Sequence, residues 1–297
     1  VNPSAQVNGL ADYNTILCDG EFTPVYSFTT ANTDGLTSFN WTNNNVVIGL
    51  AASGEGGIPS FQVTNSTQST ISATITVTPS YENNGIICDG NAETFTIMVN
   101  PSPEMDNVDD IVLCNNEISS IIEFTTPNTD GNTTYNWTND NTSIGLSSSG
   151  NGDIPSFTAI NLNPITEVAT ITVTPTYENN GVVCIGDPQT FSISVLSEIE
   201  ITATTVDALD CNDPNSGNIN ITVTGGSGVY DFLWSNGAIT EDLNNIGPGD
   251  YSVTITDSEG CIAISETFNI FRQEDLIVQL DTEIVPFCEN NLVTQEN

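Results

Sequence analysis

The residues of this chain that could do chemistry are its cysteines and its carboxylates. There are 38 Asp and Glu residues against a single cation, and the chain has no His and no Lys. Without those bases, neither Ser-His-Asp nor Schiff-base catalysis is expected, whereas a pair of carboxylates would suffice to hydrolyse a glycoside. Because Lys and Arg bind phosphate backbones and anionic lipids, binding to nucleic acid or to a membrane surface is excluded.

The seven cysteines fall in a regular pattern, at positions 18, 88, 114, 184, 211, 261 and 288. Two successive pairs are separated by 70 residues and a third by 50, which predicts one disulfide inside each of three domains: Cys18–Cys88, Cys114–Cys184 and Cys211–Cys261. Cys288 would then pair with a cysteine beyond Asn297. A zinc or redox site is disfavoured, because there is no CxxC sequence and no His. Disulfides indicate an oxidising or extracellular compartment.

Carboxylates crowd one short stretch, PSPEMDNVDD at residues 101–110. Clustered hard oxygen ligands suit calcium, and no cofactor is otherwise required. We favour a solvated acidic linker, because the spacing is not that of an EF-hand. The calcium candidates are Glu104, Asp106, Asp109 and Asp110. A catalytic pair would need two acids about 5–9.5 Å apart across a cleft. Nothing in the sequence predicts such a cleft, so we predict no catalytic residue and no enzyme.

A unit that occurs twice carries these residues. Residues 39–61 read FNWTNNNVVIGLAASGEGGIPSF, and residues 135–157, at an offset of 96, read YNWTNDNTSIGLSSSGNGDIPSF. A repeat this long indicates one folded domain made twice. We therefore divide the chain into the tail of a preceding repeat (1–7), a first domain (8–101), an acidic Pro-containing linker (102–107), a second domain (108–197), a third domain (198–275) and the start of a further repeat (276–297).

Each domain consists of short β-rich stretches between Gly, Asn and Pro turns. Alternation of Ala73, Ile75 and Val77 with threonines indicates a half-buried strand. Many short strands without an amphipathic helix predict an all-β protein of tandem immunoglobulin-like antiparallel β-sandwiches in an extended array. In the first domain we expect strands at Val25–Thr30, Ser38–Thr42, Val46–Leu50, Ser72–Thr78 and Thr94–Val99.

Large aromatic residues on these strands are expected to fill the cores. Trp41 shares its strand face with Phe39, which favours a core position over a sugar-stacking one. Trp137 and Trp234 are the corresponding residues of the other two domains. Tyr251 follows a Pro-Gly turn and enters a late strand, as in the tyrosine corner of Greek-key sandwiches.

The third domain resembles a known family. Its TGG turn, the strand YDFLWSNG, the run TEDLNNIGPGDYSVTITD and the flanking cysteines are similar to the SprB repeat of gliding-motility surface adhesins in Bacteroidota. The first two domains, through NWTNDNTSIGL, GNGDIPSF and ATITVTPTYENNG, resemble the PKD-like domains that accompany such repeats. This resemblance implies export across the outer membrane, display on the cell surface, and adhesive or scaffolding work.

We therefore expect a non-catalytic structural or adhesive stalk segment of a very large secreted cell-surface adhesin, linked to surface attachment or gliding motility. The alternative is a carbohydrate-binding module array of a secreted polysaccharide-processing protein. Expected partners are other repeats of the same long chain and a surface polysaccharide or another surface protein, with no membrane insertion in this segment. Like charges on successive domains repel within a Debye length of about 8–10 Å, which favours an extended array.

Overall fold

The first domain is organised around one long strand, β4 (Ile71–Asn83). We describe residues 2–209 and 213–272 of a computed structural model. Along β4 the side chains of Ala73, Ile75 and Val77 are fully buried, while the threonines between them face outward. The predicted strand at Ser72–Thr78 is therefore correct in its pattern, but the observed strand continues beyond it to Asn83.

Strand β4 is central in a six-stranded sheet of order β1-β6-β4-β2-β3, with β5 paired to its far half. The partners are β1 (Thr15–Cys18), β2 (Leu36–Asn43), β3 (Ser53–Glu55), β5 (Ile86–Asp89) and β6 (Glu93–Asn100). All pairs are antiparallel except β1 with β6, which is parallel. The predicted strands at Ser38–Thr42 and Thr94–Val99 correspond to β2 and β6.

A proline in the middle of β4 marks the point where its neighbour changes. β6 pairs with residues 71–77 and β5 with residues 80–83, and Pro79 lies between them. The Pro79 carbonyl accepts a hydrogen bond from Gly90 N on that same side (2.9 Å). The N–H and C=O of a strand residue point to the same side of the strand. Proline has no N–H, and at Pro79 this missing donor falls in the gap between β5 and β6, so no strand hydrogen bond is lost. Pro175 takes the same place in the second domain, with Gly186 as its donor.

The second domain repeats this sheet in the order β7-β12-β10-β8-β9, with β11 paired to β10. Its strands are β7 (Ile111–Leu113), β8 (Asn132–Asn139), β9 (Ser149–Asn151), β10 (Glu167–Asn179), β11 (Val182–Ile185) and β12 (Gln189–Val195). β7 and β12 again form a parallel edge pair. An all-β sandwich class is thus correct, with one parallel pair in each of these two sheets.

The layer opposite each sheet is formed mainly by extended segments rather than by long strands. The predicted strand at Val25–Thr30 meets the chain opposite at a single bridge, Tyr26 to Ile58. The predicted strand at Val46–Leu50 is wrong: Val46–Ile48 forms the 3-10 helix η2. The Asn45 side chain accepts from Val47 N at its start, and Gly49, with a φ of 93°, ends it. Similar short helices are η1 (Leu10–Tyr13) and η3 (Thr142–Ile144).

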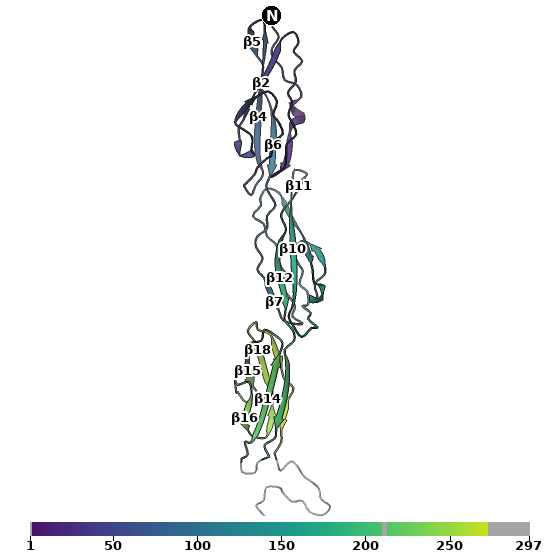
Figure 1. Ribbon diagram of the computed structural model, residues 1–297, viewed down its shortest axis with the longest axis vertical. Coiled ribbons are helices and arrows are strands. Elements are labelled where there is room, and N and C mark those ends of the chain that lie inside the picture. Colours follow the sequence, from purple (N-terminus) through teal and green to yellow (C-terminus); the bar gives the residue numbers. More distant parts are fainter. Residues whose placement is uncertain (1, 210–212, 273–297) are drawn as a thin grey trace, which may run out of the picture.

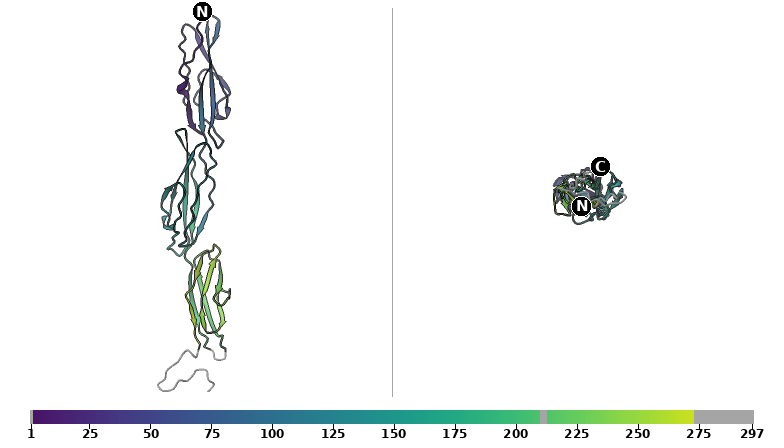
Figure 2. Two further views of the ribbon diagram at one scale, coloured as in Figure 1. Left: turned by 180° about the vertical axis from the view of Figure 1, so that it is seen from behind. Right: turned by 90° about the horizontal axis from the view of Figure 1, so that it is seen from below.

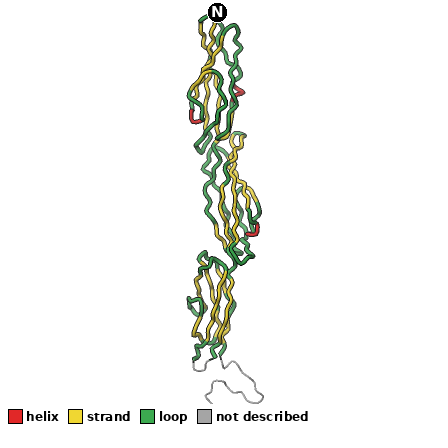
Figure 3. The backbone as a smooth tube through the Cα atoms, in the orientation of Figure 1, coloured by secondary structure: helices red, strands yellow, loops and turns green. Residues whose placement is uncertain are grey.

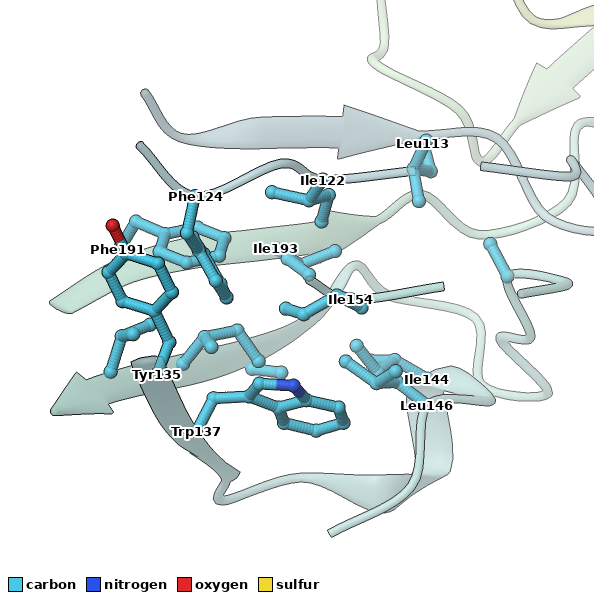
Figure 4. Packing of buried hydrophobic residues seen from close by; sticks show 14 of the residues in the cluster. Leu113, Ile122, Phe124, Tyr135, Trp137, Ile144, Leu146, Ile154, Phe191 and Ile193 are labelled. Carbon is cyan, nitrogen blue, oxygen red and sulfur yellow. The ribbon is translucent and has the colours of Figure 1, made fainter. Parts of the chain in front are cut away.

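The core lies between the sheet and this irregular layer (Figure 4). In the second domain, Phe124 from the irregular layer packs against Tyr135 and Phe191, with ring centroids 5.4 and 6.4 Å away. Trp137 lies farther along the core, near Ile144 and Leu146 in Figure 4. Its side chain is 3% exposed, and that of Trp41 in the first domain is 6% exposed.

The third domain is a smaller sandwich of short sheets, β13-β14-β16 and β15-β18-β19, with the added pair β17-β20. Trp234 is 1% exposed, and its Nε1 donates to the Thr240 carbonyl (2.8 Å). The Tyr251 hydroxyl donates to the Gly247 carbonyl four residues upstream (3.0 Å), which is the hydrogen bond of a tyrosine corner. The strands are β13 (Glu200–Val206), β14 (Gly217–Thr224), β15 (Tyr230–Trp234), β16 (Leu243–Ile246), β17 (Gly249–Tyr251), β18 (Val253–Asp257), β19 (Ile262–Ile264) and β20 (Phe268–Ile270).

The three domains follow one another end to end in a single file (Figure 1). Seen along the long axis, they superimpose on a narrow outline (Figure 2). Strands run along this axis, and loops lie both at the poles where successive domains meet and along the sides of the first two domains (Figure 3). Within the described ranges, no helix has the length and apolar character needed to cross a membrane.

Candidate functional site: the disulfide-linked domain junctions

The disulfides of this chain join neighbouring domains. Cys18 of the first domain is bonded to Cys184 of the second, and Cys114 of the second domain to Cys261 of the third. The Cα atoms are 5.6 and 5.5 Å apart, within the ordinary range for a disulfide. The predicted intradomain pairs Cys18–Cys88 and Cys114–Cys184 are therefore wrong. Cys211–Cys261 is wrong as well, because Cys261 is bonded elsewhere.

Two cysteines fall outside the described residues, and a third is unpaired within them. Cys211 and Cys288 are among the residues not described, so the predicted bridge from Cys288 is not tested. Cys88 is a half-buried free thiol in the described part of the chain.

The intradomain pairs fail because the two cysteines of a domain lie at opposite poles. Cys18 ends β1 opposite Asn100, and this end of the sheet is level with the start of β4 at Ile71. Cys88 is opposite Tyr81, ten residues farther along β4. At 3.3 Å per residue the two poles are about 33 Å apart, whereas a disulfide requires Cα atoms within about 7 Å. The spacing that the two predicted pairs share reflects the repeat, not a contact.

A hairpin turn aims the second cysteine of the repeat at the neighbouring domain. Asn180 and Gly181 both have positive φ values (51° and 79°) and form a two-residue loop between β10 and β11. This is the geometry of a type I′ turn, which suits the twist of the flanking strands. Cys184 follows on β11 and is 2% exposed.

The first cysteine of the repeat is held by a glutamate three residues on. Glu21 Oε2 accepts a hydrogen bond from Cys18 N (2.9 Å), and Glu117 Oε2 accepts from Cys114 N (2.8 Å). The carboxylate thus fixes the backbone immediately after the edge strand. The same arrangement at both poles presents each sulfur to the next domain.

Hydrogen bonds surround the first disulfide and join the same two domains. Thr129 N donates to the Gln68 carbonyl (2.7 Å), and Asn128 Nδ2 donates to Gln68 Oε1 (3.1 Å). On the hairpin side, Asn179 Nδ2 donates to Thr70 Oγ1 (2.7 Å). Several polar contacts around one covalent bond restrict the angle between domains more than the disulfide alone would.

The second junction uses a different hairpin for the same purpose. Cys261 lies in the turn between β18 and β19, and Cys114 packs against the core of the third domain. Asp257, 5% exposed, accepts from the backbone N–H groups of Ser227, Glu259 and Cys261 at 2.8 to 3.0 Å. A buried carboxylate with three donors fixes the turn that carries the cysteine.

The four calcium candidates do not come together. Each makes its own hydrogen bond: Glu104 accepts from Gln68, Asp106 from Thr125, Asp109 from Asn107, and Asp110 from Ser192. Among the described residues, no three His, Cys, Asp or Glu side chains are grouped as a metal ion would require. Calcium binding by this chain stays a prediction.

The segment expected to be an acidic linker is packed against the second domain. The Met105 side chain is 6% exposed and belongs to that domain's core. Glu104 N donates to Asn128 Oδ1 (2.7 Å), and Asp106 N donates to the Thr125 carbonyl (2.9 Å). The first junction is therefore a short packed connection.

Glutamine, threonine and asparagine side chains at the junctions were not singled out by sequence reasoning. Two signals could have found them. The tetrapeptide VNPS occurs at residues 1–4 and again at 99–102, and the Asn-Asn-Gly turn occurs at both 83–85 and 179–181. Each marks one pole of a domain, so together they define where successive domains meet.

Comparisons with known proteins match only part of the chain by sequence. The SprB repeat family model matches residues 202–239, which extend from β13 past β15. No curated protein matches the chain.

Solved structures with a related arrangement have low scores and low identity. The first three domains of the outer capsid protein Hoc of bacteriophage RB49 have a TM-score of 0.41 at 11% identity, covering 91% of this chain and 98% of that one. Mouse cadherin-23 EC22–24 has a TM-score of 0.38 at 11% identity, covering 91% and 99%. Drosophila OTK domains 3–5 have a TM-score of 0.33 at 11% identity, covering 92% and 98%. The fold of this chain is accordingly assigned from its own strands and registers.

Proposed function

We propose that this chain is a non-catalytic stalk segment of a large secreted cell-surface adhesin, displayed at the outer membrane. The observation that carries the proposal is that both domain junctions are closed by disulfides. A covalent bond from each domain to the next prevents separation of the domains under load. It also indicates an oxidising compartment. The SprB repeat match in the third domain supports a place at the cell surface.

The negative charge of the chain favours an extended arrangement of its domains. Its formal net charge is −37, with one Lys or Arg residue in total. Like charges on neighbouring domains repel over about 8–10 Å at moderate salt, which disfavours folding back of the array. The near absence of Lys and Arg also leaves almost no site for trypsin-like proteases.

The finer parts of the proposal rest on resemblance. We propose that the first two domains are PKD-like and that the parent protein serves attachment or gliding motility in Bacteroidota. Its partners would be other domains of the same long chain and a surface polysaccharide or protein. The carbohydrate-binding alternative would use an exposed aromatic platform, and all three tryptophans, Trp41, Trp137 and Trp234, are buried in the cores.

Small-angle X-ray scattering of the oxidised chain tests the stalk geometry. The central strands of the first two domains have 13 residues each and those of the third up to 8. At about 3.3 Å per residue these strands alone add up to roughly 110 Å, which corresponds to a rod with a radius of gyration of roughly 32 Å or more. A compact globule of this length would have a radius of gyration of about 19 Å. A measured radius equal to that of the globule would contradict the proposal.

Surface display is tested on the producing cells. Antibodies against the chain should label intact cells, and labelling should be lost after treatment with a protease that cleaves at Asp or Glu. Labelling that appears only after the cells are permeabilised would contradict display. Binding of the purified chain to glycans that is lost when the exposed Phe22 and Phe271 are replaced by Ala would favour the carbohydrate-binding alternative.

A further inference from the structure

We propose that the N-terminal pole of the first domain is a docking surface for the C-terminal pole of another domain of this type, closed by a disulfide at Cys88. This inference concerns how the array is extended and does not depend on any adhesive role. It rests on the structural equivalence of this pole with the pole of the second domain that carries Cys184.

The Cys88 thiol occupies the same position in the first domain as the disulfide-bonded Cys184 does in the second. Cys88 pairs with Tyr81 across the β4–β5 hairpin, as Cys184 pairs with Tyr177 across β10–β11. The turn of this hairpin again has two positive φ values, 54° at Asn84 and 75° at the following glycine. Cys184, which is bonded to Cys18 of the first domain, is 2% exposed, whereas Cys88 is half-buried and unbonded in the described residues.

The segment that enters the first domain makes the same contact as the segment that enters the second domain at the formed junction. Asn2 Nδ2 donates to the Asn83 carbonyl (3.3 Å), as Asn100 Nδ2 donates to the Asn179 carbonyl (3.4 Å). These two asparagines belong to the two copies of VNPS. This observation is independent of the cysteine. The entering segment is already positioned for a domain that ends in the same sequence.

Further contacts of that segment are repeated. Asn32 Nδ2 donates to the Ser4 carbonyl (2.9 Å), as Asn128 Nδ2 donates to the Ser102 carbonyl (3.0 Å). Gln6 N donates to Asn32 Oδ1 (2.9 Å), as Glu104 N does to Asn128 Oδ1 (2.7 Å). The pole is thus built in the conformation that accepts a neighbour.

Groups that face the partner at the formed junction are open at this pole. Thr129 N bonds to the first domain through the Gln68 carbonyl, and the equivalent Thr33 N has no hydrogen bond within the described residues. Ile86, on the hairpin, is 61% exposed, whereas the equivalent Val182 is partly covered at the formed junction. An exposed apolar side chain, an open amide and a thiol together fit a domain end such as that of Cys18.

The domain that docks on the N-terminal pole of the first domain must carry the groups that contact the equivalent pole at the formed junction. It presents a cysteine at the end of an edge strand, its N–H held by a glutamate three residues on, as Cys18 and Glu21 do. It also presents a loop with a carbonyl like that of Gln68 and a hydroxyl like that of Thr70. We assign the surface to such a domain rather than to a second Cys88.

Closing the bond requires an oxidant of the disulfide class. The Cys88 thiolate attacks a small-molecule disulfide such as glutathione disulfide, forms a mixed disulfide and releases one glutathione thiol. The thiolate of the partner cysteine then attacks the Cys88 sulfur, forms the interdomain S–S bond and releases the second thiol. Two protein S–H groups are oxidised, and one glutathione disulfide is reduced to two thiols.

The test is a chain in which an additional copy of residues 1–98 precedes Val1. In the native chain residue 98 is followed by VNPS at 99–102, and in the extended chain it is followed by VNPS at 1–4. The added copy therefore joins without a foreign linker. In the added copy Ile16→Val gives the Cys18 peptide a distinct mass, and Cys88→Ser leaves one Cys88 in the molecule. After oxidation with glutathione, the unreduced protein is digested with Asp- and Glu-specific proteases and analysed by mass spectrometry.

The expected result is a peptide pair joining the mass-marked Cys18 to Cys88. The matched control carries Cys18→Ser in the added copy, and in it Cys88 should stay available to an alkylating reagent. Melting curves of both chains show whether the added domain is folded. With a folded added domain, Cys88 recovered as an alkylated thiol, bonded to the unmarked Cys18, or bonded to a second Cys88 would each overturn the proposal.

Discussion

The two disulfides overlap in sequence, which limits how far the chain extends under force. The loop closed by Cys18–Cys184 contains Cys114, and the loop closed by Cys114–Cys261 contains Cys184. Once the domains have unfolded, tension from residue 18 to residue 261 passes through both bonds and the 70 residues between Cys114 and Cys184. These extend to roughly 250 Å, against roughly 850 Å for the same segment after reduction.

Removing one bond changes this length by an amount that depends on the pairing. With Cys18→Ser and Cys184→Ser, the load path becomes the 96 residues from position 18 to Cys114, about 90 Å longer than before. If the bonds were Cys18–Cys88 and Cys114–Cys184, the same two changes would release 140 residues and lengthen the chain by about 490 Å.

Single-molecule force spectroscopy measures this difference directly. The chain is attached at both termini, and Cys211 and Cys288 are replaced by Ser in every molecule compared. The segments outside residues 18–261 then contribute equally and cancel. The contour length after the last unfolding event should rise by about 90 Å in the double variant, and Cys88→Ser should leave it unchanged. A rise of the size calculated for intradomain bonds, or a longer Cys88→Ser chain, would refute the interdomain pairing.

Three further predictions concern one residue in each of the three domains. Gly54→Ala places a Cβ against the Trp41 indole, closer than van der Waals contact allows, so we expect a loss of about 1–3 kcal/mol of stability in a denaturant titration. Ser53→Ala, on the same strand but exposed, should have little effect. Asp257→Asn removes one acceptor from a buried carboxylate with three backbone donors, so the third domain should lose about 1–3 kcal/mol and melt earlier. A melting curve unchanged by Asp257→Asn would contradict its role in the turn. Hydrogen bonds from Asn141 and Asn163 lower the pKa of Glu167 below its usual 4.5. A lowered folded-state pKa contributes stability that is complete above the unfolded value and is lost as the pH falls through the folded one. The melting-temperature difference between the native chain and Glu167→Gln should therefore shrink on acidification below pH 4.5, and a difference that grows would be the wrong sign.

The strands that alternate strongly could be predicted from sequence. Ala73, Ile75 and Val77 alternate with threonine, and the structure buries all three. Val46–Leu50 is equally rich in β-branched residues, yet its first part is a 3-10 helix. There, the Asn45 cap and the positive φ of Gly49 decide the conformation. Local capping thus overrides β propensity where the segment is short.

The disulfide pairing could not be predicted from spacing. Because the domain is repeated, the spacing from Cys18 to Cys88 recurs from Cys114 to Cys184 whether or not these cysteines are joined. The pairing depends on the pole of the domain at which each sulfur lies. That is set by the length of β4 and by the hairpin after it, which place Cys88 beside Tyr81 and Cys18 beside Asn100. The expectation of domains each closed by its own disulfide was wrong for this reason.

The central claim is that neighbouring domains are joined covalently, and disulfide mapping of the native chain tests it most directly. The free thiols are first blocked at low pH, and the unreduced chain is then digested with Asp- and Glu-specific proteases. Mass spectrometry should recover one peptide pair joining Cys18 to Cys184 and another joining Cys114 to Cys261. Recovery of Cys18 with Cys88 and of Cys114 with Cys184 would contradict the account.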